Sequence, residues 1–225
     1  MSYQVNKQTD IFLSGEADKW FERNFADSGK KNMQHDMALN YLKGCDLNAH
    51  LILEIGCADG WRLNELNKLF NCECVGIEPS SKAIEAGMQR YANIKFMQGT
   101  ADSINLNDAS VDCIVIGFCL YLCDRADLFK IASEVDRVLK DKGILVITDF
   151  MPPFPYANRY CHKEGVLSYK MDYSSMFLWN PFYRKIYFDV MPMTGDRSDT
   201  SVDARVGLVV LQKNAEDAYP LEPFQ

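Results

Sequence analysis

The chain lacks most of the features by which metal-binding, secreted and membrane proteins are recognised in sequence. It has three histidines and eight cysteines, with no C-x-x-C pair and no zinc-type spacing, so we expect no metal site and reduced, structural thiols. No apolar run approaches the roughly 18 residues of a membrane span, and the N-terminus has no apolar signal-peptide core. These absences predict a soluble, cytoplasmic protein that makes no membrane contact.

Clusters of basic residues are also missing. The formal net charge is −7, from 24 Lys and Arg against 31 Asp and Glu. Nucleic-acid binding depends on clustered cations that neutralise phosphates, so we expect no nucleic-acid partner. A chain of 225 residues with 48% hydrophobic residues can bury a core of its own. We therefore expect a single domain; a monomer or homodimer is the expected assembly.

From residue 51 onward, short apolar runs alternate with amphipathic stretches. The apolar runs predict strands at 51–56, 73–78, 94–99, 111–118 and 143–150. Strands that alternate with helices form right-handed βαβ units, and hence a parallel sheet covered on both faces. The last two runs, 184–191 and 204–213, are joined by a polar turn and predict a hairpin. The expected fold is α/β, a doubly wound, mostly parallel seven-stranded sheet with one antiparallel strand.

The chain divides along this pattern into four parts of one domain, 1–225. The expected parts are an N-terminal helical cap (1–45), a ligand-binding core (46–150), a helical and aromatic insertion (151–183) and the C-terminal hairpin (184–213). Within the cap we expect a helix over 14–26 that Ser14 caps, and a second helix over 35–44 that ends at Gly44. In the core, Asp124 is expected to cap the helix before the fifth strand.

Acidic and glycine residues follow the first three predicted strands. Glu54, Gly56 and Gly60 belong to the first strand and its loop, Glu78 ends the second strand, and Asp102 follows the third. Ligands of open α/β sheets bind beyond these strand ends. The glycines permit a sharp turn and a close approach of the ligand, and the acids suit a ligand that donates hydrogen bonds.

Two cofactor classes compete for these loops. A dinucleotide site would require G-x-G-x-x-G, but Ala58 stands at the middle position and Trp61 follows Gly60. Asp59 would add a further anion beside a pyrophosphate. A cationic cofactor that carries an adenosine without phosphates fits this acidic set better.

The stretches LEIGCADG, GIEPS, GTADSI and VDCIVIGF with RVLKDKGILVI resemble motifs of the class I S-adenosylmethionine-dependent methyltransferases, in their small-molecule, type-11-like branch. The resemblance covers about residues 45–150. It implies a Rossmann-like methyltransferase fold, S-adenosyl-L-methionine as cofactor and S-adenosyl-L-homocysteine as product. The cofactor-binding positions that it implies are Trp20, Arg23, Glu54, Gly56, Cys57, Ala58, Gly60, Glu78, Pro79, Ala101, Asp102 and Phe118.

The resemblance also implies a role for each part of this set. Glu54 and the turn 56–60 would hold the methionine end, and Glu78 would bind the ribose hydroxyls. Asp102 and the adjacent backbone amide would bind the adenine edge, and Phe118 would lie beside the transferable methyl group. Many members have glycine where this chain has Ala58, so we expect a negative φ there. Trp20 and Arg23 correspond to a segment that often closes over the cofactor. Arg23 would then pair with the methionine carboxylate; an ordinary surface position for the arginine is the alternative.

Eleven of the 27 aromatic residues lie between residues 154 and 188. So long a connection suggests a functional lid, and its tyrosines would suit a ring that carries hydroxyl groups. Phe177, Phe182 and Phe188 are expected instead to pack the insertion onto the sheet. The insertion is therefore the predicted acceptor-binding segment.

Methyl transfer to a hydroxyl requires removal of one proton, and His162 in the insertion is the first candidate for the base. Tyr156 and Asp149 are further catalytic candidates, with Tyr169 and Asp172 as alternates. The predicted function is methyl transfer to a small molecule, with a sugar or sugar-nucleotide hydroxyl or amine as the hypothesised acceptor. An NAD-dependent oxidoreductase and a non-catalytic S-adenosylmethionine-binding protein are the alternatives.

Overall fold

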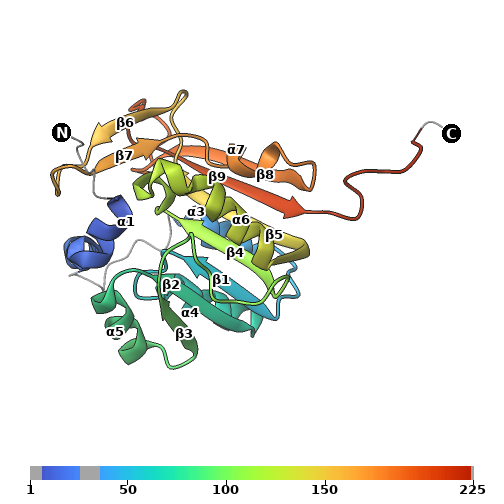
Figure 1. The fold of residues 1–225 in the computed structure, drawn as a ribbon, viewed down its shortest axis with the longest axis horizontal. Coiled ribbons are helices and arrows are strands. Elements are labelled where there is room, and N and C mark those ends of the chain that lie inside the picture. The colour runs from blue at the N-terminus through green and yellow to red at the C-terminus, as the bar shows by residue number, and fades with distance from the viewer. Residues whose placement is uncertain (1–6, 26–35, 224–225) are drawn as a thin grey trace.

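A seven-stranded sheet forms the centre of the molecule (Figure 1). The computed structural model describes residues 7–25 and 36–223. The strands of the sheet are β1 (Leu51–Ile55), β2 (Glu73–Glu78), β3 (Ile94–Gln98), β4 (Val111–Gly117), β5 (Leu139–Phe150), β8 (Tyr183–Pro192) and β9 (Arg205–Lys213). Their order is β3-β2-β1-β4-β5-β9-β8, and β9 is antiparallel to both of its neighbours. The predicted mostly parallel sheet with one antiparallel strand is confirmed.

Helices cover both faces of the sheet. The helices that cover it are α3 (Met37–Lys43), α4 (Trp61–Phe70), α5 (Ser81–Arg90), α6 (Leu128–Val138) and α7 (Ser175–Leu178). Buried side chains of α3, α4 and α5 join one apolar cluster, and those of α6 and α7 join the cluster on the opposite face. No helix of the described residues is both long enough and apolar enough to cross a membrane.

The predicted helix at 35–44 corresponds to α3. The Asp36 side chain accepts a hydrogen bond from the Leu39 amide at 2.7 Å and caps the helix, and Gly44 is its C-cap as expected. Residue 35 lies outside the described residues.

The N-terminal segment consists of helical pieces rather than the single helix predicted over 14–26. These are α1 (Gln8–Ile11), a π-helical turn η1 (Phe12–Glu16) and α2 (Ala17–Phe25), with a kink at Gly15, where φ is +129°. Ser14 lies within the turn, and its hydroxyl donates to the Ile11 carbonyl at 3.0 Å. The predicted Ser14 cap is therefore wrong, because the helical path begins earlier; residue 26 lies outside the described part.

Asp124 caps a different helix from the one predicted. Its carboxylate accepts hydrogen bonds from the Gln8 and Thr9 amides at 3.0 and 2.9 Å, so it caps α1. Helix α6 instead follows a 3₁₀ turn, η4 (Arg125–Asp127), and has no side-chain cap. Asp124 is thus a helix-capping residue, as its type predicts, but the amides that it caps belong to α1, which is distant in the sequence.

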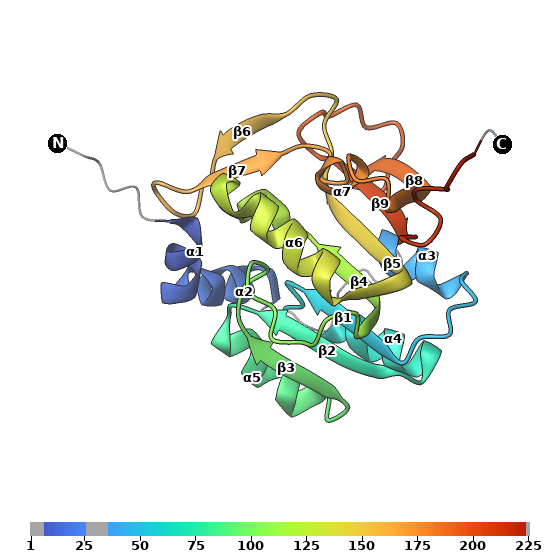
Figure 2. The same cartoon turned by 45° about the vertical axis from the view of Figure 1, so that its right-hand side comes forward.

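The insertion after β5 is mainly a two-stranded ribbon, with less helix than predicted. Strands β6 (Tyr156–Arg159) and β7 (Leu167–Lys170) pair antiparallel, outside the main sheet (Figure 2). The Gln8 side-chain amide exchanges two hydrogen bonds with the backbone of Leu167, at 2.7 and 3.1 Å. The ribbon thus fixes the N-terminal segment in place.

Only part of the expected aromatic packing is found in this region. Phe177 is buried and Phe182 packs against the same cluster, as predicted. Phe188 lies on the edge strand β8 and is 50% exposed, so its predicted burial is wrong. An edge strand has a neighbour on one side only, which leaves such a side chain uncovered.

Candidate functional site

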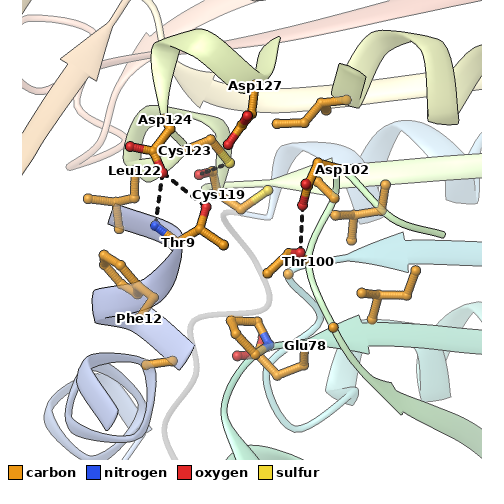
Figure 3. A pocket seen from close by; sticks show the side chains of 18 of the residues that line it. Thr9, Phe12, Glu78, Thr100, Asp102, Cys119, Leu122, Cys123, Asp124 and Asp127 are labelled. Atoms are coloured by element: carbon orange, nitrogen blue, oxygen red, sulfur yellow. Dashed lines mark hydrogen bonds between the residues drawn. The ribbon is translucent and has the colours of Figure 1, made fainter. Parts of the chain in front are cut away.

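Two pockets adjoin at the carboxyl ends of the parallel strands. The first, of about 860 Å³, is lined by Glu78, Asp102, Asp124 and Asp127 among others, and we call it the acidic pocket (Figure 3). The second, of about 1190 Å³, includes Met191 to Met193 beside the β8–β9 connection, and we call it the hairpin pocket. Both pockets share four lining residues, namely Trp20, Gly56, Gly117 and Phe118. The two pockets are therefore neighbours that adjoin along these four residues.

The glycine-containing loop after β1 forms the floor shared by the two pockets. Gly56 has a φ of +73°, and a Cβ added there would lie 2.9 Å from the Cβ of Cys119. Only glycine fits this conformation without displacing the neighbouring turn. Ala58 has a φ of +50°, so the negative φ expected there is wrong. An alanine in the left-handed region costs roughly 1 kcal/mol.

Glu78 at the end of β2 holds this loop. Its two carboxylate oxygens accept the amides of Ala58 and Ser80, each at 2.9 Å. Burial raises the pKa of Glu78 from 4.5 to about 7. Each oxygen retains a second lone-pair direction, so the group can still accept hydrogen bonds from a ligand in the acidic pocket.

Asp102 provides the second acceptor of the acidic pocket. It accepts a hydrogen bond from the Thr100 hydroxyl at 2.6 Å and from the Lys130 ammonium at 3.0 Å. Partial burial raises the pKa of Asp102, but these two hydrogen bonds outweigh it and lower the pKa below 3.8. The carboxylate is therefore ionised at neutral pH.

The charge of the acidic pocket is of one sign. Four carboxylates line it, and within the described part of the chain no Lys or Arg does. A pyrophosphate would meet only repulsion from these side chains, whereas a cation or a set of hydroxyl donors would be attracted.

The N-terminal segment closes one side of the acidic pocket. Phe12, Ala17 and Trp20 line it, and the Ser80 hydroxyl donates to Asp18 at 2.7 Å, which anchors α2 to the start of α5. Arg23 points elsewhere: it donates to Glu16 at 2.6 Å and to the Tyr160 hydroxyl at 2.9 Å. Of the two N-terminal residues predicted at the site, only the tryptophan lines it.

Phe118 stands where the two pockets meet. Its φ is +51°, an unusual conformation for an aromatic residue, and its amide donates to the Thr148 carbonyl at 2.8 Å. The ring makes an edge contact with Phe150, with 5.6 Å between ring centroids. Such strained residues concentrate at functional sites, because the surrounding fold holds a side chain where the site requires it.

A buried ionic cluster lies in the hairpin pocket. Arg62 of α4 pairs with Glu54 of β1 and, at 2.7 Å, with Asp36 before α3. All three residues line the pocket. Arg62 and Asp36 were not predicted from the sequence, because no local motif brings the three positions together.

The acids predicted as one group at the strand ends therefore have different surroundings. Glu54 is paired with Arg62, and Asp59 is turned away to Arg90 at 2.5 Å and lines neither pocket. Glu78 and Asp102 do face the acidic pocket together. The expectation that Glu54 and Asp59 share one acidic site with Glu78 and Asp102 is therefore wrong. The other two acids of the acidic pocket are Asp124 and Asp127, which come from the segment before α6.

The predicted cofactor positions in the loops otherwise gather at the two pockets. Pro79 and Ala101 line the acidic pocket, and Cys57 and Ala58 line the hairpin pocket. Gly60 lies behind the loop, with a φ of +75° and the Phe96 ring against it, and lines neither pocket.

The walls of the hairpin pocket differ from those expected. They come from the N-terminal helices, from α4 and from the β8–β9 hairpin, with Phe25, Trp61, Met191 and Met193 among them. None of the eleven aromatic residues of the segment 154–188 lines either pocket as the structure describes them. No sequence pattern indicated that residues of the β8–β9 hairpin line this pocket, because strand pairing alone brings them to it.

None of the three catalytic candidates, His162, Tyr156 and Asp149, lines either pocket. His162 is exposed and stacks edge-on against Tyr160, with 5.3 Å between centroids. The Tyr156 hydroxyl donates a hydrogen bond to Asp203 at 2.6 Å. Asp149 is buried, and its carboxylate accepts hydrogen bonds from the amides of Tyr121 and Phe150.

Tyr169 and Asp172, the alternate candidates for the base, lie in the insertion, and both side chains contact other residues. Arg125 lies over the Tyr169 ring at 4.4 Å, and Asp172 accepts the Ser174 hydroxyl at 2.6 Å. A base role for any of these residues stays a prediction. Within the described residues, no group of three His, Cys, Asp or Glu side chains is placed to hold a metal ion.

Asp149 makes a testable contribution to the pH dependence of stability. Burial raises its pKa from 3.8 to about 7, so the folded protein takes up a proton that the unfolded chain binds only near pH 4. The free energy of unfolding should therefore rise as the pH falls from 8 to 5, by about 1 kcal/mol per pH unit from this group. Urea titrations at several pH values give the free energy of unfolding as a function of pH. This pH dependence should be weaker in Asp149→Asn than in wild type, and unchanged in Asp46→Asn, at an exposed position. An equal pH dependence in all three proteins would contradict the assignment.

Comparison with known proteins accounts for this arrangement of loops. A family model described as a methyltransferase domain matches residues 52–143, which include the loops after β1, β2 and β3. Over this segment the chain is a methyltransferase domain. S-adenosylmethionine is the cofactor of this family, and the predicted family and its Rossmann-like fold are confirmed.

Individual methyltransferases support the same assignment over the core. An uncharacterised methyltransferase of Bacillus subtilis, YcgJ, is 31% identical over 110 residues, which are 46% of this chain and 42% of that protein. A demethylmenaquinone methyltransferase of Thermotoga maritima is 32% identical over 110 residues, 48% of this chain and 47% of that protein. The chain thus matches less than half the length of these curated relatives.

A solved structure extends the likeness of fold to most of the chain. The 1,6-didemethyltoxoflavin-N1-methyltransferase of Burkholderia thailandensis superposes with a TM-score of 0.65 over 92% of this chain and 90% of that one. The two sequences are 10% identical, so this methyltransferase shares the fold alone.

Proposed function

We propose that this methyltransferase binds S-adenosylmethionine across the two pockets and transfers its methyl group to a small molecule in the hairpin pocket. The observation that carries the proposal is the junction at Phe118, where an acidic pocket that suits an adenosine adjoins a second, larger pocket. When bound, the cofactor supplies a methyl group on a positively charged sulfur, from which a nucleophile displaces it.

The residues of the acidic pocket fit the cofactor. Glu78 offers acceptor lone pairs to a ribose diol, and Asp102 with the Ala101 amide offers one acceptor and one donor to an adenine edge. The absence of any cationic side chain from the described lining suits a nucleoside without phosphates. Trp20 closes over this pocket from the N-terminal segment.

The other end of the cofactor would lie along the loop after β1. Gly56 lines both pockets, and a Cβ there would collide with the turn at Cys119, so only glycine lets this loop lie so close to that turn. Glu54, held by Arg62, lines the adjoining pocket and is suited to the amino group of the methionine end. Arg23 is engaged with Glu16, so we assign it to fixing α2 rather than to the cofactor carboxylate.

The two alternatives receive less support. An NAD-dependent oxidoreductase must hold a pyrophosphate, for which the acidic pocket offers four carboxylates. A non-catalytic binding protein would need no second pocket, yet about 1190 Å³ adjoins the proposed methyl position.

For the methyl acceptor we propose only a chemical class, whereas for the cofactor we propose a single compound. The names of the Thermotoga and Burkholderia relatives specify ring compounds as substrates, which supports a small ring-shaped acceptor here. The sugar or sugar-nucleotide acceptor hypothesised from the sequence relied on tyrosines of the insertion, and these line neither pocket.

Isothermal titration calorimetry tests the proposal directly. We expect S-adenosylhomocysteine to bind with micromolar affinity and NADH to give no binding heat at the same concentration. Methyl transfer from radiolabelled S-adenosylmethionine to a panel of ring compounds would then separate a catalyst from a binding protein. Binding of NADH in preference to S-adenosylhomocysteine would refute the proposal.

A further inference from the structure

A buried ammonium group lies between the insertion and the proposed site. Lys170 of β7 is 6% exposed, and its Nζ lies 4.0 Å from the centre of the Phe150 ring. That ring makes edge contacts with Phe118, at the junction of the two pockets, and with Tyr121, at centroid distances of 5.6 and 5.1 Å. Burial of a cation is costly unless the cation is paired, so a specific partner is required here.

That partner is Asp203, in the connection between β8 and β9. The Nζ of Lys170 donates to the backbone carbonyl of Asp203 at 2.7 Å and pairs with its Oδ1 at 2.9 Å. The same Oδ1 accepts the Tyr156 hydroxyl at 2.6 Å and the Asn158 side-chain amide at 2.7 Å. Hydrogen bonds from Lys170 and Tyr156 lower the pKa of Asp203 below 3.8, so the carboxylate is ionised at neutral pH. Three side chains of the ribbon β6–β7 therefore converge on one residue of the neighbouring connection (Figure 2).

These contacts hold the backbone of the connection rather than serve the carboxylate itself. The Asp203 side chain is 61% exposed, so water can hydrate it without help from the ribbon. The backbone carbonyl of the next residue, Ala204, accepts the Met193 amide at 2.8 Å, and Met193 lines the hairpin pocket. A chain of direct contacts thus leads from Lys170 through Asp203 to the wall of that pocket.

The part of the wall held in this way is apolar. Four residues at the end of β8 and the start of the connection line the hairpin pocket, namely Met191, Pro192, Met193 and Gly195. They share this lining with Trp61 and Phe118. Aromatic faces favour planar rings, and methionine adapts to the outline of a ring. Because Met193 is 59% exposed, its place depends on the backbone that carries it.

We propose that Lys170 and Asp203 are positioning residues of the hairpin pocket: through their ion pair, the insertion holds the β8–β9 wall and sets the affinity for a ring-shaped acceptor. The insertion then acts on the acceptor through this wall. Tyr156, a candidate base from the sequence, takes part in the same support through Asp203. This inference rests on the proposed function, because it takes the hairpin pocket as the acceptor site.

Hydrogen exchange tests the wall without any ligand. Lys170→Met removes the charge and keeps most of the apolar stem. The Met193 amide should exchange at least tenfold faster in this variant than in wild type, because the backbone that carries its acceptor is no longer held. The amides of β1, in the centre of the sheet, should exchange at the wild-type rate. A general loss of stability would instead accelerate both sets of amides.

Binding measurements test the consequence for the acceptor. Calorimetric titration of 1-naphthol, a planar apolar ring with one hydroxyl, into protein saturated with S-adenosylhomocysteine should give a five- to tenfold higher Kd for Lys170→Met than for wild type. The Kd of S-adenosylhomocysteine should stay within about twofold, since neither Lys170 nor Asp203 lines a pocket. A merely structural role would not separate the two affinities.

Asp203→Asn removes the other charge of the pair. Its side chain is 61% exposed, so this variant should fold even if Lys170→Met does not. It should raise the Kd of 1-naphthol about threefold and the exchange rate of the Met193 amide by a similar factor. The double variant should bind 1-naphthol no more weakly than Lys170→Met alone, because side chains that act as one unit are not additive.

Lys185→Met is the matched control. Lys185 lies on β8, is exposed, places its Nζ 5.1 Å from the centre of the Phe188 ring and lines neither pocket, so its substitution should change neither measurement. Unchanged exchange of the Met193 amide in Lys170→Met would overturn the inference, as would equal Kd values for 1-naphthol or no binding of 1-naphthol to wild type. A parallel loss of affinity for both ligands would also overturn it. Failure of wild type to bind S-adenosylhomocysteine would instead overturn the proposed function, while the exchange measurement would still test the wall.

Discussion

Glu78→Gln is expected to weaken the binding of S-adenosylhomocysteine by about 30- to 100-fold. Glutamine keeps the size of the side chain but has one acceptor oxygen, while the carboxylate serves the Ala58 and Ser80 amides and, by our proposal, the ribose diol. Hydrogen bonds to charged groups contribute about 1.5–3 kcal/mol each, and 1.4 kcal/mol corresponds to a factor of ten in affinity. Calorimetric titration measures the change.

The pH dependence of the same titration identifies the responsible group. Because burial raises the pKa of Glu78 to about 7, and the ionised form is the better acceptor, wild-type affinity should fall as the pH is lowered from 8 to 6. The glutamine variant should lose this dependence. Glu85→Gln, at an exposed position of α5, is the control and should bind as wild type does. A Glu78→Gln variant within threefold of wild type would show that the ribose lies elsewhere.

Arg62→Met is expected to lower the free energy of unfolding by about 3–5 kcal/mol. The arginine is 7% exposed and lies between the carboxylates of Glu54 and Asp36. Methionine fills much of the space, but it leaves the buried Glu54 and the half-buried Asp36 carboxylates without their cation. Removing one partner of a buried ion pair is strongly destabilising. Urea denaturation should show the loss as a lower midpoint at an unchanged slope.

Two further variants test the electrostatic cause. Lys68→Met removes an exposed cation from the same helix and should change stability by less than about 0.5 kcal/mol. Adding Glu54→Gln and Asp36→Asn to Arg62→Met removes the stranded charges and should restore part of the stability. A loss below 1 kcal/mol in Arg62→Met alone would mean that water reaches the cluster.

The core of the fold could be predicted from the sequence because its signals are local. The run ECVGIE predicted a strand over 73–78, and β2 spans Glu73–Glu78. Gly56 predicted a turn that only glycine allows, and its φ of +73° agrees. Alternating strands and helices then leave few arrangements of a parallel sheet, and the strand ends bring Glu78 and Asp102 into one pocket.

Contacts between distant segments could not be predicted in this way. Asp124 has the residue type of a helix cap, but it caps α1, more than a hundred residues away, rather than the helix that follows it. The aromatic insertion suggested a lid from its composition, yet its ribbon holds the N-terminal segment and leaves the wall of the hairpin pocket to Met191 and Met193. Composition gives the chemistry of a segment but not the surface that it covers.

The sequence alone therefore determined the sheet, the glycine turn and the two acids, Glu78 and Asp102, that line the acidic pocket, because each depends on neighbours within a few residues. Tertiary structure decided the rest of the site. Arg62 reached Glu54 and Asp36 through the packing of α4 and α3, and Lys170 reached Asp203 only where the ribbon β6–β7 meets the β8–β9 connection. Burial and pairing are properties of the assembled layers, and no single stretch of sequence encodes them.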